Sequence, residues 1–150
     1  MRPKILKFGM NLWPPFLGAG IRVKHIAADY SEIIVSMKLR WYNRNYMGTH
    51  FGGSLAAMTD PFYMVMLIHI LGSDYTVWDK SSTIDFIAPG RGTVTARLTL
   101  NDAQISDIKR KTASSEPYLP EFSVDIVNES GEVIAKVEKK LYIRKKQGKV

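Results

Sequence analysis

The feature that most constrains this chain is a run of 11 residues, from Pro61 to Leu71, in which only His69 is polar in character. A helix that is apolar on every side must be buried on every side. The run is shorter than the roughly 20 residues that a helix needs to cross a bilayer. We therefore expect the core helix of a soluble domain, with the remaining chain wrapped around it and no membrane as a partner.

Length and composition indicate one domain over residues 1–150. The chain has 150 residues, of which 45% are hydrophobic, so it can bury a substantial core. The absence of cysteine excludes disulfides and thiolate chemistry and fits a reducing compartment. The charged start of the chain is followed by no apolar signal core, because Pro14 and Pro15 interrupt it. The expected location is the cytoplasm.

The net charge of +7 is concentrated at one end of the chain. Residues 136–150 contain seven Lys or Arg and one Glu, whereas the residues before them are nearly balanced. This distribution is typical of one basic strand and a solvated tail, which we place at about 144–150. A nucleic-acid partner is therefore not expected, since such a partner favours a basic stripe across the whole domain.

Alternation of apolar and polar residues predicts five or six strands, each with one buried face. The clearest stretch has five apolar residues on one side: Ile33, Val35, Met37, Leu39 and Trp41. Further inward-facing series are Ile21, Val23 and Ala27; Ile84, Phe86 and Ala88; Val94, Ala96, Leu98 and Leu100; Phe122, Val124 and Ile126; and Val133, Ala135, Val137, Leu141 and Ile143. Lys139 is the one break in the last series.

Two more helices are expected outside the core. One covers about 4–19 and is broken at Pro14 and Pro15, because a proline cannot continue a helical ladder. The other is a short polar helix over 103–113, which Asn101 and Asp102 could cap.

The predicted fold class is α+β, with an antiparallel sheet wrapped around one long apolar helix. Short turns between strands imply antiparallel neighbours. A single sheet covers only part of a central helix and leaves strand edges exposed. A homodimer, or a dimer of dimers, would cover both, so we expect a homo-oligomer.

Two segments resemble a known family. The pattern Asn45-x-x-Gly48-Thr49-x-x-Gly52-Gly53, with Asp60 seven residues later, and the segment 84–92 resemble the signature of hot-dog-fold acyl-coenzyme A thioesterases of the phenylacetate-pathway type. The resemblance covers about residues 20–145 and is closest to a branch whose members are largely of unassigned function. It implies a hot-dog fold and the hydrolysis of an acyl thioester, with coenzyme A as part of the substrate and no separate cofactor.

The resemblance also implies roles for individual positions. Asp60 falls on the catalytic carboxylate, Gly52 and Gly53 on the glycines whose amides polarise the thioester carbonyl, and Asn45 on the polar residue at the loop start. The family usually has histidine immediately before the glycine pair, where this chain has Phe51. His50 stands one residue earlier, which turns its side chain by about 100° on a helix, so that role does not transfer to it.

The residues themselves leave two interpretations of Asp60 open. Glycines at a helix start expose amide groups that can hold an oxyanion, and a carboxylate two turns later can activate water. Asp60 followed by Pro61 is equally typical of a helix N-cap with proline at the first helical position. Because Pro61 cannot continue a helix, a kink or break next to Asp60 is predicted under either interpretation.

The remaining candidates are assigned to substrate binding. They are Phe51, His50, Asp79, which is expected before the third strand, and Arg91, which lies in a turn and could meet a nucleotide phosphate. The histidines have no metal-ligand spacing, so no metal is expected. The leading hypothesis is a thioesterase acting on an acyl-coenzyme A or related thioester. The alternative is a non-catalytic protein that binds such a ligand, which Phe51 in the usual histidine position favours.

Overall fold

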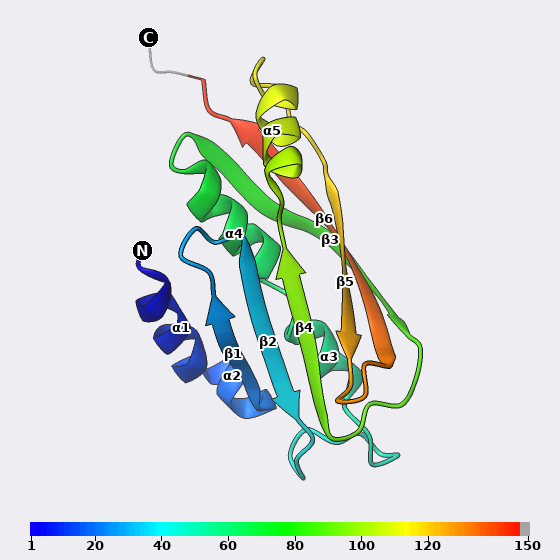
Figure 1. Ribbon diagram of the computed structural model, residues 1–150. Coiled ribbons are helices and arrows are strands. Elements are labelled where there is room, and N and C mark those ends of the chain that lie inside the picture. The colour runs from blue at the N-terminus through cyan, green and yellow to red at the C-terminus, as the bar shows by residue number, and fades with distance from the viewer. Residues whose placement is uncertain (148–150) are drawn as a thin grey trace.

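The computed structural model describes residues 1–147 and contains one sheet of six strands. They are β1 (Ile21–Ile26), β2 (Glu32–Lys38), β3 (Tyr75–Phe86), β4 (Thr93–Thr99), β5 (Glu121–Val127) and β6 (Val133–Lys145). All neighbours are antiparallel, in the order β1-β2-β4-β5-β6-β3. The sheet curves from β1 on the left of Figure 1 to β6 and β3 on the right, with the central helix behind it. The predicted α+β fold is therefore confirmed.

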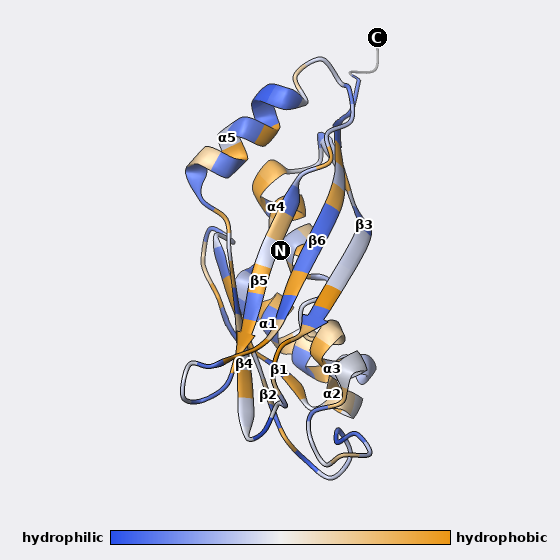
Figure 2. Ribbon diagram, turned by 90° about the vertical axis from the view of Figure 1, so that its right-hand side faces the viewer, coloured by the Kyte–Doolittle hydropathy of each residue, from blue (hydrophilic) through white to orange (hydrophobic). Residues whose placement is uncertain are grey.

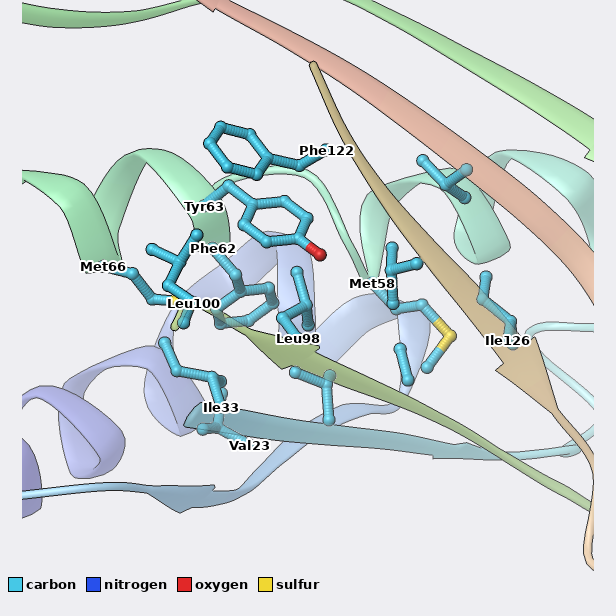
Figure 3. Close-up of a cluster of buried hydrophobic side chains, with 14 of the residues drawn as sticks. Val23, Ile33, Met58, Phe62, Tyr63, Met66, Leu98, Leu100, Phe122 and Ile126 are labelled. Atoms are coloured by element: carbon cyan, nitrogen blue, oxygen red, sulfur yellow. The ribbon is translucent and has the colours of Figure 1, made fainter. Parts of the chain in front are cut away.

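The central helix has two parts, α3 (Gly52–Ala57) and α4 (Phe62–Leu71), separated by a turn. The break occurs next to Asp60 and Pro61, where the sequence predicts it. Taken as one segment, Gly52–Leu71 is long and apolar enough to cross a membrane, but half of its apolar stretch is buried inside the domain. Figure 3 shows Met58, Phe62 and Met66 of this segment packed among side chains from the sheet.

The alternation that predicts the strands is visible as bands of apolar and polar residues along β4, β5 and β6 in Figure 2. The inward-facing residues of β4 and β5 are buried as predicted: Val94, Ala96, Leu98, Phe122, Val124 and Ile126. One side of the sheet therefore packs on α3 and α4, and the other carries the polar residues.

Two strand ends differ from the prediction. β2 ends at Lys38, and Trp41 is exposed, because the amide of Arg40 donates to Asn43 Oδ1 and the chain turns away from the sheet. In β1 a register shift between Val23 and His25 brings Ile26, and not Ala27, into the core. Alternation alone cannot reveal such a bulge.

Three helices lie outside the central pair. The N-terminal segment forms α1 (Pro3–Leu12) and α2 (Pro14–Ala19), which break at Trp13. Phe16 of α2 packs on Phe62 of α4, with ring centroids 5.8 Å apart. The third helix, α5 (Asp102–Lys111), begins with a capping box formed by Asn101 and Gln104. β6 extends through Lys145, so the basic tail starts later than predicted, and its residues 148–150 lie outside the described part of the chain.

β3 is an edge strand, because within residues 1–147 it pairs with β6 alone. It begins at Tyr75, earlier than the sequence indicates, so Asp79 lies within the strand and not before it. Residues 81–83 are exposed in a row, although alternation would bury every second one. Trp78 and Phe86 are exposed as well. An edge with apolar side chains and unpaired backbone groups is suited to pair with a second copy.

Candidate functional site

The loop before α3 is organised by Asn45. Its amide nitrogen donates to Thr49 Oγ1 at 2.9 Å and to the His50 carbonyl at 3.3 Å. Its side-chain oxygen accepts from the amides of Met47, at 2.9 Å, and Thr49, at 3.1 Å. Both the donor and the acceptor group of Asn45 are thus used inside its own loop, which fixes the entry to the central helix.

His50 ties this loop to the turn after β3. Its side chain is buried, and Nε2 lies 2.9 Å from the Gly92 carbonyl, to which it donates. That bond leaves Nδ1 as the unprotonated nitrogen, buried without a hydrogen-bond partner among the described residues. Burial lowers the pKa of His50, and the bond to Gly92 opposes this only in part. His50 is therefore held in its neutral form and contacts Gly90 of the same turn.

Gly52 and Gly53 start α3, and each lies directly beneath an aromatic ring. A Cβ at Gly52 would lie 2.8 Å from Cζ of Phe86, and one at Gly53 would lie 2.6 Å from Cε1 of Phe51. Phe51 is the N-cap residue of α3 and provides no side-chain hydrogen bond. The first amides of a helix have no partner within the helix, so those of Gly52 and Gly53 can bind an oxyanion.

Asp60 lies in the turn between α3 and α4 and does not cap a helix. α4 begins at Phe62, and its N-cap is Pro61, with no side-chain hydrogen bond to the first turn. The Asp60 side chain is 67% exposed, and its Oδ1 accepts a hydrogen bond from Lys139 Nζ at 3.1 Å. The N-cap interpretation of Asp60 is therefore wrong, and the carboxylate is available at the surface of the domain.

Lys139 links Asp60 to Asp79. It points inward from β6, its side chain is only 1% exposed, and Nζ also lies 3.2 Å from Asp79 Oδ1. Burial raises the pKa of Asp79, while the Lys139 ammonium lowers it and the Asp60 charge adds to the rise. A buried ammonium needs anionic partners, and these two carboxylates supply them. Lys139 is the residue of this site that was not among the sequence candidates, although it was the one break in the inward-facing series of its strand.

Six of the sequence candidates line one of two cavities next to α3. The larger, about 610 Å³, is lined by residues that include Asn45, His50, Gly52 and Arg91. The smaller, about 370 Å³, is lined by residues from four segments: Trp13, Phe16, Gly53, Ala57, Asp60 and Ile84. Gly52 and Asp60 therefore line different cavities within one chain.

Two further candidates have exposed side chains. Phe51 is 54% exposed beside Gly53, and Arg91 is exposed at the rim of the larger cavity. Phe86 was predicted on the inner face of its strand, but it is exposed and lines the larger cavity. Its ring lies over Gly52 of α3 and so faces inward as predicted, but the sheet ends at β3 and leaves the ring open to solvent. Among residues 1–147, no three His, Asp or Glu side chains group in a way that could hold a metal ion.

Comparison with known proteins assigns the family. The model of DUF4442, described as a domain of unknown function, matches residues 2–143, so the chain belongs to this family. No curated protein sequence matches it.

Solved structures show the same fold. A Pseudomonas aeruginosa protein of unknown function, described as a probable thioesterase, has a TM-score of 0.83 at 15% identity, covering 96% of this chain and 98% of that one. A Haemophilus influenzae thioesterase has a TM-score of 0.70 at 15% identity over 97% and 92% of the two chains. A point mutant of the phenylacetic acid degradation protein PaaI of Thermus thermophilus gives 0.59 at 22% identity over 87% and 98%. The chain therefore has the hot-dog fold of thioesterases, as the sequence resemblance implied.

Proposed function

We propose that this protein is a thioesterase that hydrolyses an acyl-coenzyme A or a related acyl thioester. The observation that carries the proposal is the position of Asp60. Asp60 lies at the break in the central helix and does not cap α4. Its carboxylate lines a cavity and accepts a hydrogen bond at Oδ1 from the buried Lys139. Similar structures described as thioesterases, among them the Haemophilus influenzae protein, support the same class of activity.

Asp60 acts as the general base in this mechanism. It takes a proton from a water molecule while the water oxygen attacks the thioester carbonyl carbon. The amides at the start of α3, of Gly52 and Gly53, stabilise the negative charge that develops on the carbonyl oxygen. The tetrahedral intermediate then collapses, the carbon–sulfur bond breaks, and the departing thiolate takes up the proton held by Asp60. Lys139 is a positioning residue, because it contacts the carboxylate and not the substrate.

The complete site lies between two subunits in this proposal. Within one chain, Gly52 and Asp60 line different cavities, whereas Gly53 lines the cavity of Asp60, so the two glycine amides are divided as well. Pairing of two copies along their free β3 edges would bring the larger cavity of one subunit toward the central-helix break of the other. The exposed Trp78 and Phe86 support this arrangement, since both lie on that edge strand. Arg91 at the rim of the larger cavity is then placed to meet a coenzyme A phosphate.

The test is thiol release from a series of acyl-coenzyme A substrates by the Asp60→Asn variant. The amide cannot accept the proton, so kcat should fall by about 100-fold or more, with the fold retained in circular dichroism. Asp125→Asn is the matched control, because Asp125 is exposed on β5 and outside both cavities. Unchanged turnover in the Asp60→Asn variant would rule out the mechanism.

A second candidate is a non-catalytic protein that binds the same ligand. Phe51 favours it, because an aromatic ring occupies the usual histidine position and covers Gly53. Calorimetric binding of acyl-coenzyme A, combined with no thiol release across all chain lengths, would select this function over hydrolysis.

A further inference from the structure

α1 carries an apolar stripe that faces solvent. Ile5, Phe8 and Leu12 are spaced so that they share one face of the helix. All three are more than half exposed, Phe8 at 68%. Trp13, directly after the helix, is also exposed. Single exposed apolar residues are ordinary, but an ordered row of this kind marks an interaction surface.

The orientation of this stripe is fixed by the opposite face of α1. Met10 is buried there and Leu6 packs against the core. Asn11 clamps the helix to β1, because its side chain donates to the Val23 carbonyl at 3.0 Å and accepts from the Val23 amide at 2.8 Å. These contacts prevent α1 from rotating, so the stripe cannot turn toward the domain. Figure 1 shows α1 at the margin of the molecule, beside β1.

The charged side chains of α1 and of the residue before it are all positive. Arg2, Lys4 and Lys7 belong to α1 or the residue before it, and no acidic residue occurs before Asp29. None of the ion pairs formed within residues 1–147 involves these three basic residues. The surface therefore combines apolar side chains, a tryptophan and free cations. This combination is typical of helices that lie in the interface of an anionic bilayer.

A second copy of the chain fits this surface less well than a bilayer. A ten-residue helix is about 15 Å long, and its exposed face is far smaller than the roughly 800 Å² that each partner buries in a stable interface. Two copies meeting through α1 would also bring the basic residues of one against those of the other. A lipid surface has neither limitation, because it offers an extended apolar layer below anionic headgroups.

We propose that α1 and Trp13 bind the surface of an anionic lipid bilayer. The apolar stripe enters the headgroup region, and the exposed Arg2 and Lys4 contact lipid phosphates. An apolar hollow of about 400 Å³ between Ile5, Leu12 and Trp13 can accept part of an acyl chain. The expectation that no membrane is involved rested on the length needed for spanning, which is irrelevant to a helix lying on the surface. Binding of this kind would bring the domain to the source of lipid-derived acyl groups.

The experiment is flotation of the full chain with vesicles made from equal amounts of phosphatidylcholine and phosphatidylglycerol, compared with vesicles of phosphatidylcholine alone. The wild-type protein should float with the anionic vesicles and not with the neutral ones. Leu12→Glu should lower the partition coefficient about tenfold or more, since it removes apolar contact and adds a negative charge. Arg2→Gln and Lys4→Gln should each lower it about fivefold.

The matched control is Leu119→Glu, the same substitution at an exposed leucine in the connection between α5 and β5. This variant should bind as the wild type does, and so should Asp60→Asn, which separates the result from the proposed hydrolysis. In a Trp41→Phe/Trp78→Phe variant, emission from Trp13 should shift to the blue when anionic vesicles are added. Absence of vesicle binding, equal effects of the two leucine substitutions, or self-association that Leu12→Glu abolishes would each overturn the proposal.

Discussion

His50 shows how a single buried side chain can make the stability of the domain depend on pH. Its neutral imidazole donates from Nε2 to Gly92, and burial lowers its pKa. The folded state therefore binds a proton at His50 less readily than the unfolded state does. The contribution of neutral His50 to the free energy of unfolding is complete above the pKa of His50 in the unfolded chain. It is lost as the pH falls toward the pKa of His50 in the folded protein. The free energy of unfolding should decrease as pH drops below about 6.5.

The check is urea unfolding between about pH 8 and pH 5.5 for the wild type and for His50→Gln. Glutamine can donate from a similar position without titrating, so the variant should lose less stability over this range. His25→Gln, at an exposed position on β1, is the control and should retain the dependence of the wild type. An equal decrease in all three proteins would contradict this role of His50.

At the scale of elements, Lys139 couples β6 to β3 and to the break in the central helix. Lys139→Met leaves the Asp79 carboxylate partly buried without its cation, which should lower the free energy of unfolding by about 2–3 kcal/mol. In an Asp79→Asn background the same substitution should cost less, because the carboxylate left without its cation is then the solvent-exposed Asp60. A double-mutant cycle of urea denaturation measures this difference, and strictly additive costs would show that the two side chains do not interact.

The pH dependence of the Lys139→Met variant provides an independent check on the same contact. The ammonium of Lys139 lowers the pKa of Asp79, which burial raises. Removing the ammonium should raise this pKa further, so the variant should regain stability relative to the wild type as pH falls and Asp79 becomes neutral.

The elements were largely predictable from the sequence, and the reasons are physical. Apolar residues at every second position predict a strand with one face on the core, and this pattern alone was enough to locate β4 and β5. An apolar run next to proline encodes a buried helix with a break, which α3 and α4 show. Lys139 was visible as a break in its strand, but its partners were not, since Asp60 and Asp79 are distant in sequence. Their meeting depends on the pairing of β3 with β6 and on the irregularity after Asp79, which periodicity does not record.

The surface residues were less predictable for a related reason. Alternation shows which face of a strand is apolar, but not whether a neighbour covers it. Phe86 was therefore assigned to the core, although it lies exposed on an edge strand over Gly52. In the same way, the sequence does not show which apolar residues of α1 reach the core: Leu6 and Met10 do, whereas the exposed stripe does not.

At the scale of the whole molecule, the division of the site between two cavities leads to a test of its assembly. If Gly52 of one subunit acts with Asp60 of the other, Asp60→Asn and Gly52→Ala dimers should each be inactive. The second should fail because the new Cβ would lie only 2.8 Å from the Phe86 ring, which must then move over the start of α3. A mixed dimer, however, contains one site with both native residues.

Mixing the two inactive variants under conditions of subunit exchange should therefore restore thiol release. Random pairing makes about half of the dimers mixed, each with one of its two sites intact, so about one quarter of the wild-type activity is expected. A site completed within one chain would predict no recovery, because each subunit would keep its own defect. Affinity-tagged subunits show whether mixed dimers have formed. If mixed dimers form and thiol release does not recover, the site is not shared between subunits. Recovery would instead assign the acid and the oxyanion amide to different subunits, and catalysis would then require the pairing of two copies.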